Sequence, residues 1–191
     1  MSEQSIFIVG MMGSGKSTVG RRLADLMGLD FVDADGVIEE RAGADISWIF
    51  DVEGEDGFRK REEQVLDTLS QRPAIVLATG GGAVLRNANR RRLRDRGVVV
   101  YLRGSVDIIV ARTRHDRRRP LLQGLGQGVD VRERLADLLE QRTPLYEEVA
   151  HVVVDTDEGS ALRVAERVRQ AIAAHREGGP RPSRGDERCR D

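Results

Sequence analysis

Residues 10–17 have the types and the spacing of a phosphate-binding loop. They read Gly-Met-Met-Gly-Ser-Gly-Lys-Ser and fit the pattern G-x-x-x-x-G-K-[ST]. Glycines let successive backbone N–H groups approach phosphate oxygens, Lys16 can reach the β- and γ-phosphates, and the Ser17 hydroxyl can ligate magnesium. The rival dinucleotide pattern G-x-G-x-x-G fails, because Thr18 occupies the third glycine position. The nucleotide-binding residues predicted in this segment are Gly13, Ser14, Gly15, Lys16, Ser17 and Thr18.

Two carboxylates follow the next apolar run. Asp33 and Asp35 come after Phe31-Val32, and residues two apart at a strand end point the same way. Both could therefore face the phosphate site, one near magnesium through water and the other near a substrate hydroxyl. Alternatively, either Asp could N-cap a helix that begins near Val37. Spacing alone leaves both interpretations open.

A triple glycine and an arginine are further candidates for ligand contact. Thr79 precedes Gly80-Gly81-Gly82, and three glycines cost so much backbone entropy that a close ligand approach is one explanation. An ordinary loop is the other. Arg59 could bind a carboxylate through two parallel hydrogen bonds, or it could be a solvated charge on a helix face.

The elements that must position these residues alternate along the chain. Short apolar runs without alternation predict strands buried on both faces, at Ile6–Val9, Phe31–Val32, Ile75–Ala78, Val98–Leu102 and Val152–Val154. Helical patterns lie between them, and the first should end at Gly28 as a C-cap. This alternation predicts a doubly wound α/β domain, which binds ligands beyond the carboxyl ends of its strands. Each candidate motif starts where an apolar run stops.

Two segments fall outside this pattern. Residues 114–130 combine arginines and aspartates with Pro120 and three glycines, which predicts a mobile loop. Residues 176–191 are polar and rich in Gly and Pro, which predicts a disordered tail. The remaining residues, 1–175, should form a single domain.

Composition excludes several classes of protein. The chain has 191 residues, is 39% hydrophobic and carries a formal net charge of −1, so bulk electrostatics would not hold it to nucleic acid or a membrane. Cys189 is the single cysteine, which rules out a disulfide within the chain. No apolar run approaches the ~20 residues of a membrane helix, and no signal-peptide pattern precedes the first strand. We expect a cytoplasmic protein.

Taken in order, these blocks resemble the shikimate kinase family along nearly the whole chain, from about residue 5 to 174. The P-loop is common to many families, whereas the combination of the other blocks is more specific. The blocks that carry the resemblance are the P-loop, Asp33-Ala34-Asp35, Gly57-Phe58-Arg59 with Glu62-Glu63, Ala78-Thr79-Gly80-Gly81-Gly82, Arg119-Pro120-Leu121-Leu122 and Arg142-Thr143-Pro144-Leu145-Tyr146.

The resemblance implies a role for each matching residue. Asp33 would lie in the outer shell of magnesium bound by Ser17, Arg119 would be a lid arginine that reaches the phosphates, and Lys16, Asp35 and Arg119 would be catalytic. Arg112 and the loop that contains Gly159 would flank the adenine, although glycine leaves only a backbone contact there. The implied shikimate-binding residues are Asp35, Arg59, Gly80, Gly81, Gly82 and Arg142.

The resemblance also implies the fold and the reaction. The fold would be a three-layer, five-stranded parallel sheet of the nucleoside-monophosphate-kinase kind, with a mobile lid at about 112–130 and a substrate-binding helical region at about 35–62 that includes Trp48 and Phe50. The reaction would be Mg²⁺- and ATP-dependent phosphorylation of the 3-hydroxyl of shikimate, a step of aromatic amino-acid biosynthesis. We expect a monomer whose partners are these two small molecules.

Three other functions remain to be weighed. A kinase for another polyol acid, such as gluconate, should lack the glycine triplet combined with Arg59 and Arg142. A guanine-nucleotide switch usually carries Asn-Lys-x-Asp, which is absent from this sequence. The arginines at 90–94 and 112–119 could contact nucleic acid, but lid arginines of a phosphotransferase explain the second group better.

Overall fold

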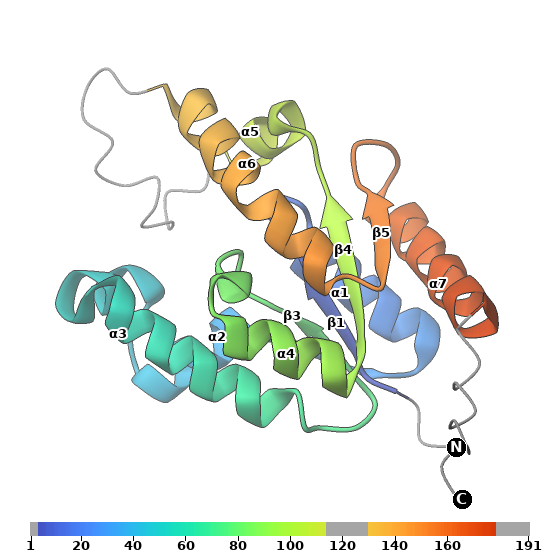
Figure 1. Cartoon of the computed structure of the whole chain (residues 1–191), viewed down its shortest axis with the longest axis horizontal. Coiled ribbons are helices and arrows are strands. Elements are labelled where there is room, and N and C mark those ends of the chain that lie inside the picture. Colours follow the sequence, from blue (N-terminus) through green and yellow to red (C-terminus); the bar gives the residue numbers. More distant parts are fainter. Residues whose placement is uncertain (1–3, 114–129, 179–191) are drawn as a thin grey trace, which may run out of the picture.

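The computed structural model describes residues 4–113 and 130–178. Its core is a five-stranded, fully parallel sheet in the order β2-β3-β1-β4-β5 (Figure 1). Each apolar run predicted to be a strand forms one, with extensions of no more than two residues. The strands are β1 (Ile6–Val9), β2 (Asp30–Asp33), β3 (Ile75–Ala78), β4 (Val98–Arg103) and β5 (Val152–Asp155).

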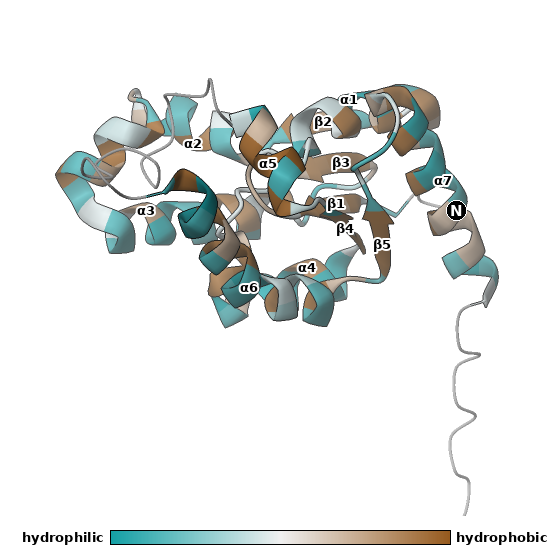
Figure 2. Ribbon diagram, turned by 90° about the horizontal axis from the view of Figure 1, so that it is seen from above, coloured by the Kyte–Doolittle hydropathy of each residue, from teal (hydrophilic) through white to brown (hydrophobic). Residues whose placement is uncertain are grey.

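Helices cover both faces of the sheet, which gives the predicted three layers (Figure 2). On one face, α1 (Lys16–Met27) and α7 (Ala161–Gly178) pack apolar side chains such as Leu23 and Val168 against the strands. On the other, α3 (Ile46–Leu69), α4 (Asn87–Arg96) and α6 (Val131–Val149) close a second apolar core around Phe7 and Tyr101. The remaining helices are α2 (Ala34–Ala42), η1 (Ala83–Leu85) and α5 (Val106–Thr113).

Backbone conformation fixes both ends of α1. Gly15 precedes the helix with φ 93°, a left-handed conformation that side chains disfavour, and Lys16 is the first helical residue. Gly28 ends the helix in the left-handed region, as predicted, and its N–H donates to the Ala24 carbonyl. The P-loop lysine and serine therefore lie in the first turn of a helix, where backbone N–H groups favour an anion.

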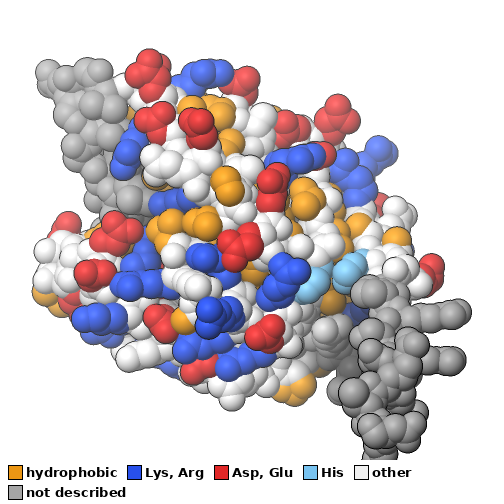
Figure 3. Space-filling model, viewed as in Figure 1, with side chains coloured by type: hydrophobic (Ala, Val, Ile, Leu, Met, Phe, Trp, Pro, Cys, Tyr) orange, Lys and Arg blue, Asp and Glu red, His pale blue; other side chains and the backbone are white. Residues whose placement is uncertain are grey.

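The helix α3 bends at Gly54, whose φ of 71° and ψ of 178° are not helical. Its second half, which carries Arg59, is joined to α4 by ion pairs. Arg92 contacts Glu63 at 3.0 Å and Asp67 at 3.2 Å, and Arg96 contacts Asp67 at 2.7 Å. On the surface over these helices, basic side chains are interspersed with acidic ones (Figure 3). The arginine-rich stretch of α4 thus has a structural role in holding α3.

Two predicted boundaries change or lie beyond the described residues. Helix α7 continues to Gly178, so residues 176–178, predicted to belong to the disordered tail, are helical. The rest of that tail, and residues 114–129 of the predicted lid, lie outside the described residues. At the C-terminal end of the segment predicted to be a lid, Asp130 caps α6 by accepting a hydrogen bond from Arg132 N at 2.8 Å. Within the described ranges, no helix is both long and apolar enough to cross a bilayer.

The backbone and side chain of His151 help to join β4 to β5. His151 donates its backbone N–H to the Val99 carbonyl at 2.9 Å, and its Nδ1 accepts the Val99 N–H at 3.0 Å. This second bond requires a neutral ring, because a protonated Nδ1 is a donor. Burial lowers the pKa of His151, and the nearby His175 and Arg94 lower it further.

We therefore predict that acid weakens this junction. Because the folded-state pKa lies below the usual value of about 6.5, the unfolded chain binds more protons, and the free energy of unfolding should fall as the pH drops below that value. The change should not exceed about 1 kcal/mol, the scale of one hydrogen bond. Urea unfolding at pH 7.5 and 5.5 checks it. His151→Asn, which keeps an acceptor but does not titrate, should show a smaller difference; an equal difference would assign the effect to other groups.

Candidate active site

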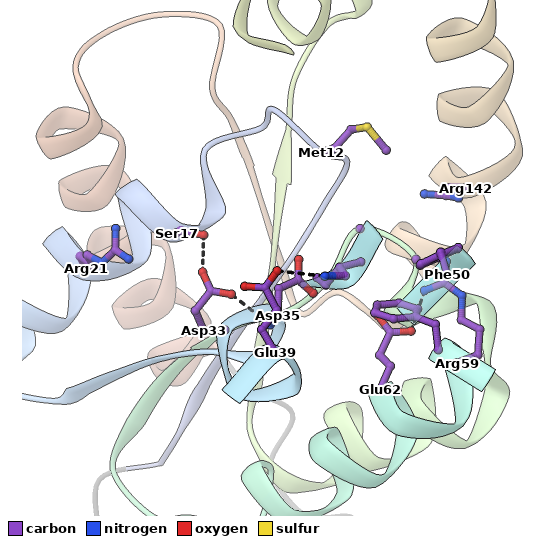
Figure 4. A pocket seen from close by; sticks show the side chains of 16 residues that line it. Met12, Ser17, Arg21, Asp33, Asp35, Glu39, Phe50, Arg59, Glu62 and Arg142 are labelled. Carbon is purple, nitrogen blue, oxygen red and sulfur yellow. Dashed lines mark hydrogen bonds and ion pairs between the residues drawn. The ribbon is translucent and has the colours of Figure 1, made fainter. Parts of the chain in front are cut away.

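A cavity of about 620 Å³ lies at the carboxyl ends of β1, β2 and β3, where the P-loop meets α2 and α3 (Figure 4). This is the edge at which parallel α/β sheets bind ligands. Polar groups from four separate chain segments meet in the cavity, and two phenylalanines form an apolar part of the wall. The lining residues are Met12, Ser17, Arg21, Asp33, Asp35, Gly36, Glu39, Ile46, Phe50, Phe58, Arg59, Glu62, Gly80, Gly81, Gly82 and Arg142.

The P-loop holds its lysine within the loop itself. Lys16 is nearly buried, and its Nζ donates to the carbonyl oxygens of Gly10 and Met11, each at 2.9 Å. The loop is packed tightly, since a Cβ on Gly10 would lie 2.6 Å from the Leu102 carbonyl oxygen. The Lys16 ammonium is thus fixed beside the backbone that should cradle phosphates.

Ser17, Asp33 and Asp35 form a hydrogen-bonded series. The Ser17 hydroxyl donates to Asp33 Oδ2 at 2.6 Å, and Asp33 Oδ1 accepts the backbone N–H of Asp35 at 3.1 Å (Figure 4). Asp33 is thereby the N-cap of α2, which begins at Ala34 and not near Val37. The capping interpretation is correct for Asp33 and wrong for Asp35. Asp35 lies in the first turn of α2, so strand alternation was the wrong reason for placing both carboxylates in one site.

The oxygen atoms of Ser17 and Asp33 are the candidate site for a metal ion. In the described part of the chain, no group of three or more His, Cys, Asp or Glu residues could hold a metal ion. Ser17 Oγ and Asp33 Oδ2 are hard oxygen donors 2.6 Å apart, beside the phosphate loop. They fit a magnesium ion bound by Ser17, with Asp33 in its outer shell and its other ligands supplied by phosphates and water, as is usual for Mg²⁺ in nucleotide sites.

Arg59 enters the cavity as part of an ion-pair cluster. It is 5% exposed, and it contacts Glu62 at 2.7 Å and Glu55 at 3.2 Å. Burial alone would lower the pKa of Arg59, but the two carboxylates outweigh that effect and raise it, so the guanidinium stays charged. Burial raises the pKa of Glu62, and Arg59 opposes that shift. Arg59 is therefore a fixed cation and not a solvated surface charge.

The glycine triplet packs against these charges. A Cβ on Gly82 would overlap the Arg59 guanidinium, and one on Gly80 would lie 2.6 Å from Glu62 Oε1 and 2.8 Å from Asp35 Oδ1. Glycine is thus required here because side chains from α2 and α3 press on the loop, whatever a ligand adds. Arg142, from α6, is 4% exposed, and its buried NH1 has no hydrogen-bond partner among the described residues. A buried donor of this kind favours an anionic ligand.

A model of the family described as shikimate kinase matches residues 12–173 of this chain. The chain belongs to the shikimate kinase family. Curated shikimate kinases of Mannheimia succiniciproducens and Alteromonas mediterranea are 54% and 57% identical to it over 170 and 166 residues, which are 89% and 87% of this chain and 95% of each relative.

Solved structures agree with this assignment. A shikimate kinase from Acinetobacter baumannii in complex with shikimate has a TM-score of 0.85 and 48% identity, covering 90% of this chain and 94% of that one. A gluconokinase from Sinorhizobium meliloti shares the fold, with a TM-score of 0.55, 22% identity, and coverage of 92% of this chain and 97% of its own.

Some residues that the family resemblance implied lie away from the cavity. Arg112 donates to the Thr156 carbonyl at 2.9 Å and lies 3.4 Å from the Gly13 carbonyl, so it joins the P-loop to the loop after β5. Gly159, in the same loop, has a φ of 92°. Thr18 is exposed and lines a separate groove on α1. Arg119 lies outside the described residues.

Sequence reasoning did not assign a role to several lining residues of this shikimate kinase. Glu62 is fully buried, and its position three residues after Arg59 on a helix was the signal that could have paired them. Phe58 packs against Phe50, which was expected in the substrate-binding region. Their ring centroids are 4.6 Å apart with an interplanar angle of 35°, and the two rings form an apolar wall. Trp48, expected in the same region, is 52% exposed and does not line the cavity. The additional lining residues are Met12, Arg21, Gly36, Glu39 and Ile46.

Proposed function

We propose that this protein transfers the γ-phosphoryl group of ATP to the 3-hydroxyl of shikimate. The observation that carries the proposal is that two buried arginines, Arg59 and Arg142, line one cavity with Asp35 and the glycine triplet, and that this cavity reaches the P-loop at Ser17. Membership of the shikimate kinase family supports it, and so does the similar A. baumannii enzyme, whose structure contains shikimate.

The chemistry of the substrate matches the cavity. Shikimate carries one carboxylate and three hydroxyls on a small ring. Arg59 and Arg142 bind the carboxylate, because guanidinium groups recognise it through parallel hydrogen bonds. Asp35 accepts a hydrogen bond from one hydroxyl, and Phe50 and Phe58 provide an apolar surface for the ring.

Phosphoryl transfer then needs mainly positioning and charge neutralisation. Lys16 stabilises charge that develops on the transferred group, and Asp35 orients the attacking hydroxyl and accepts its proton. Magnesium, held by Ser17 with Asp33 in its outer shell, would neutralise phosphate charge. Arg119, Arg112 and Gly159 remain proposed nucleotide contacts. The monomeric state and the cytoplasmic location also stay predictions.

An assay of ADP release tests the proposal against its nearest rival. Turnover should require shikimate and a divalent cation, and it should exceed the rate with gluconate, quinate or nucleoside monophosphates at equal concentration. Likeness to the gluconokinase shows the fold alone, because the two chains are 22% identical. Stimulation by gluconate but not by shikimate would overturn the proposal.

We predict that Arg59→Lys impairs the enzyme nearly as much as Arg59→Ala. The guanidinium contacts two glutamates and adjoins Gly82, and a single ammonium cannot replace this planar group. The KM for shikimate should rise by about 10-fold or more, with the KM for ATP little changed. The matched control is Arg61→Lys, two residues away on the surface, where Arg61 pairs with Glu53 at 2.6 Å. Equal losses in the two Lys variants would make Arg59 a purely structural residue.

A further inference from the structure

Tyr146, which does not line the cavity, contacts the glycine triplet. Tyr146 is on α6, four residues after Arg142, so the two side chains lie on the same face of the helix, one turn apart. Tyr146 is fully buried and is not among the residues that line the cavity. Its hydroxyl donates to the Gly81 carbonyl oxygen at 2.5 Å.

The Tyr146 hydroxyl is fixed as a donor. Burial raises the pKa of Tyr146 well above its usual value, and this outweighs the opposing effect of Arg142, so the group remains an O–H at any pH the enzyme meets. The ring stacks on Tyr101 of β4, with centroids 5.0 Å apart and an interplanar angle of 24°. The sheet thus determines where the hydroxyl points.

The peptide unit that Tyr146 contacts is held between the two arginine-bearing helices. Its carbonyl, from Gly81, meets α6 through Tyr146, and its next residue, Gly82, lies so close to the Arg59 guanidinium that a Cβ would overlap it. On a third side, a Cβ on Gly81 would lie 3.2 Å from Met12 N of the P-loop. A rotation of this one peptide would therefore displace Arg59 relative to Arg142 and to the P-loop.

We infer that Tyr146 is a positioning residue that fixes the spacing between the two carboxylate-binding arginines. Through the Gly81–Gly82 peptide, its hydroxyl connects the helix of Arg142 to the guanidinium of Arg59. The inference rests on the proposed function, since it assigns the two arginines to the substrate carboxylate. It assigns Tyr146 no contact with either substrate.

Tyr146→Phe removes only the hydroxyl and keeps the stacked ring. We expect the KM for shikimate to rise by about 10-fold, the scale of one lost buried hydrogen bond, with kcat and the KM for ATP changed much less. Tyr101→Phe is the matched control, because it removes a hydroxyl from the same stack, and that hydroxyl interacts with the Thr143 side chain and not with the triplet. For an analogue of shikimate that lacks the carboxylate, the KM should be the same in Tyr146→Phe as in the unaltered enzyme. Equal losses with both substrates, or in both tyrosine variants, would overturn the inference.

A second measurement is made on the unaltered enzyme, so it does not require Tyr146→Phe to fold. The chain contains two tyrosines, so labelling the unaltered enzyme with 3-fluorotyrosine gives two ¹⁹F resonances, which Tyr101→Phe assigns. Saturation with shikimate should shift the Tyr146 resonance more than that of Tyr101, and the carboxylate-free analogue should not. An unmoved Tyr146 resonance would contradict the inference. Failure of the unaltered enzyme to phosphorylate shikimate would instead contradict the proposed function.

Discussion

Replacing Asp35 with Asn should lower kcat for shikimate by about 10²-fold or more, because the variant keeps the shape of the side chain but cannot accept a proton. Asp35 lines the cavity with Arg59 and Arg142, and its Oδ1 lies against Gly80. Shikimate binding should weaken less than kcat, and ATP binding should be nearly unchanged. Steady-state kinetics with each substrate varied in turn measures all three quantities.

The structure gives this experiment a clear interpretation. Since Asp33 caps α2, loss of activity in Asp35→Asn cannot come from a lost helix cap. Glu39→Gln is a useful comparison, because Glu39 lines the same cavity, and its Oε1 accepts the Ile46 N–H at 3.1 Å, a bond that Gln retains. Glu39→Gln removes one negative charge near Asp35 and should lower kcat by less than about 10-fold. A near-normal kcat in Asp35→Asn would reduce Asp35 to a binding residue.

The second large effect is expected at Lys16. Lys16→Ala should lower kcat by about 10²-fold or more at saturating ATP, because the ammonium stabilises charge that develops on the transferred phosphoryl group. The substitution also removes a donor from the carbonyls of Gly10 and Met11, so the melting temperature should be recorded alongside activity. The second of the two lysines, Lys60, is exposed, and Lys60→Ala is the matched control. Normal turnover in a folded Lys16→Ala enzyme would show that the P-loop match is incidental.

Much of the fold could be predicted because its signals are local. Buried parallel strands read as continuous apolar runs, and the five runs predicted here are the five strands observed. The end of α1 was equally clear, since Gly28 adopts the left-handed conformation that a C-cap requires. Parallel topology then brings the segments after β1, β2 and β3 to one edge, so the cavity was predictable in outline.

The parts that could not be predicted depend on side chains from distant elements. The N-cap at Asp33 turns Asp35 into a helical residue, and spacing alone left that start open between two interpretations. The triple glycine was explained either by ligand approach or by an ordinary loop, and the contacts of Glu62, Asp35 and Arg59 with it were not foreseen. The contact between Tyr146 and Gly81 joins residues 65 positions apart, and no local pattern encodes it.

Identification of the product tests most directly whether this protein phosphorylates the 3-hydroxyl of shikimate. Equal concentrations of shikimate and gluconate should be incubated with the enzyme, a divalent cation and limiting ATP, and the ³¹P spectrum recorded with proton coupling. We predict one phosphomonoester, coupled to the proton on carbon 3 of shikimate, with ADP formed in equal amount. A gluconate ester, an ester on another shikimate hydroxyl, or free phosphate without any ester would show that the protein does not catalyse this reaction.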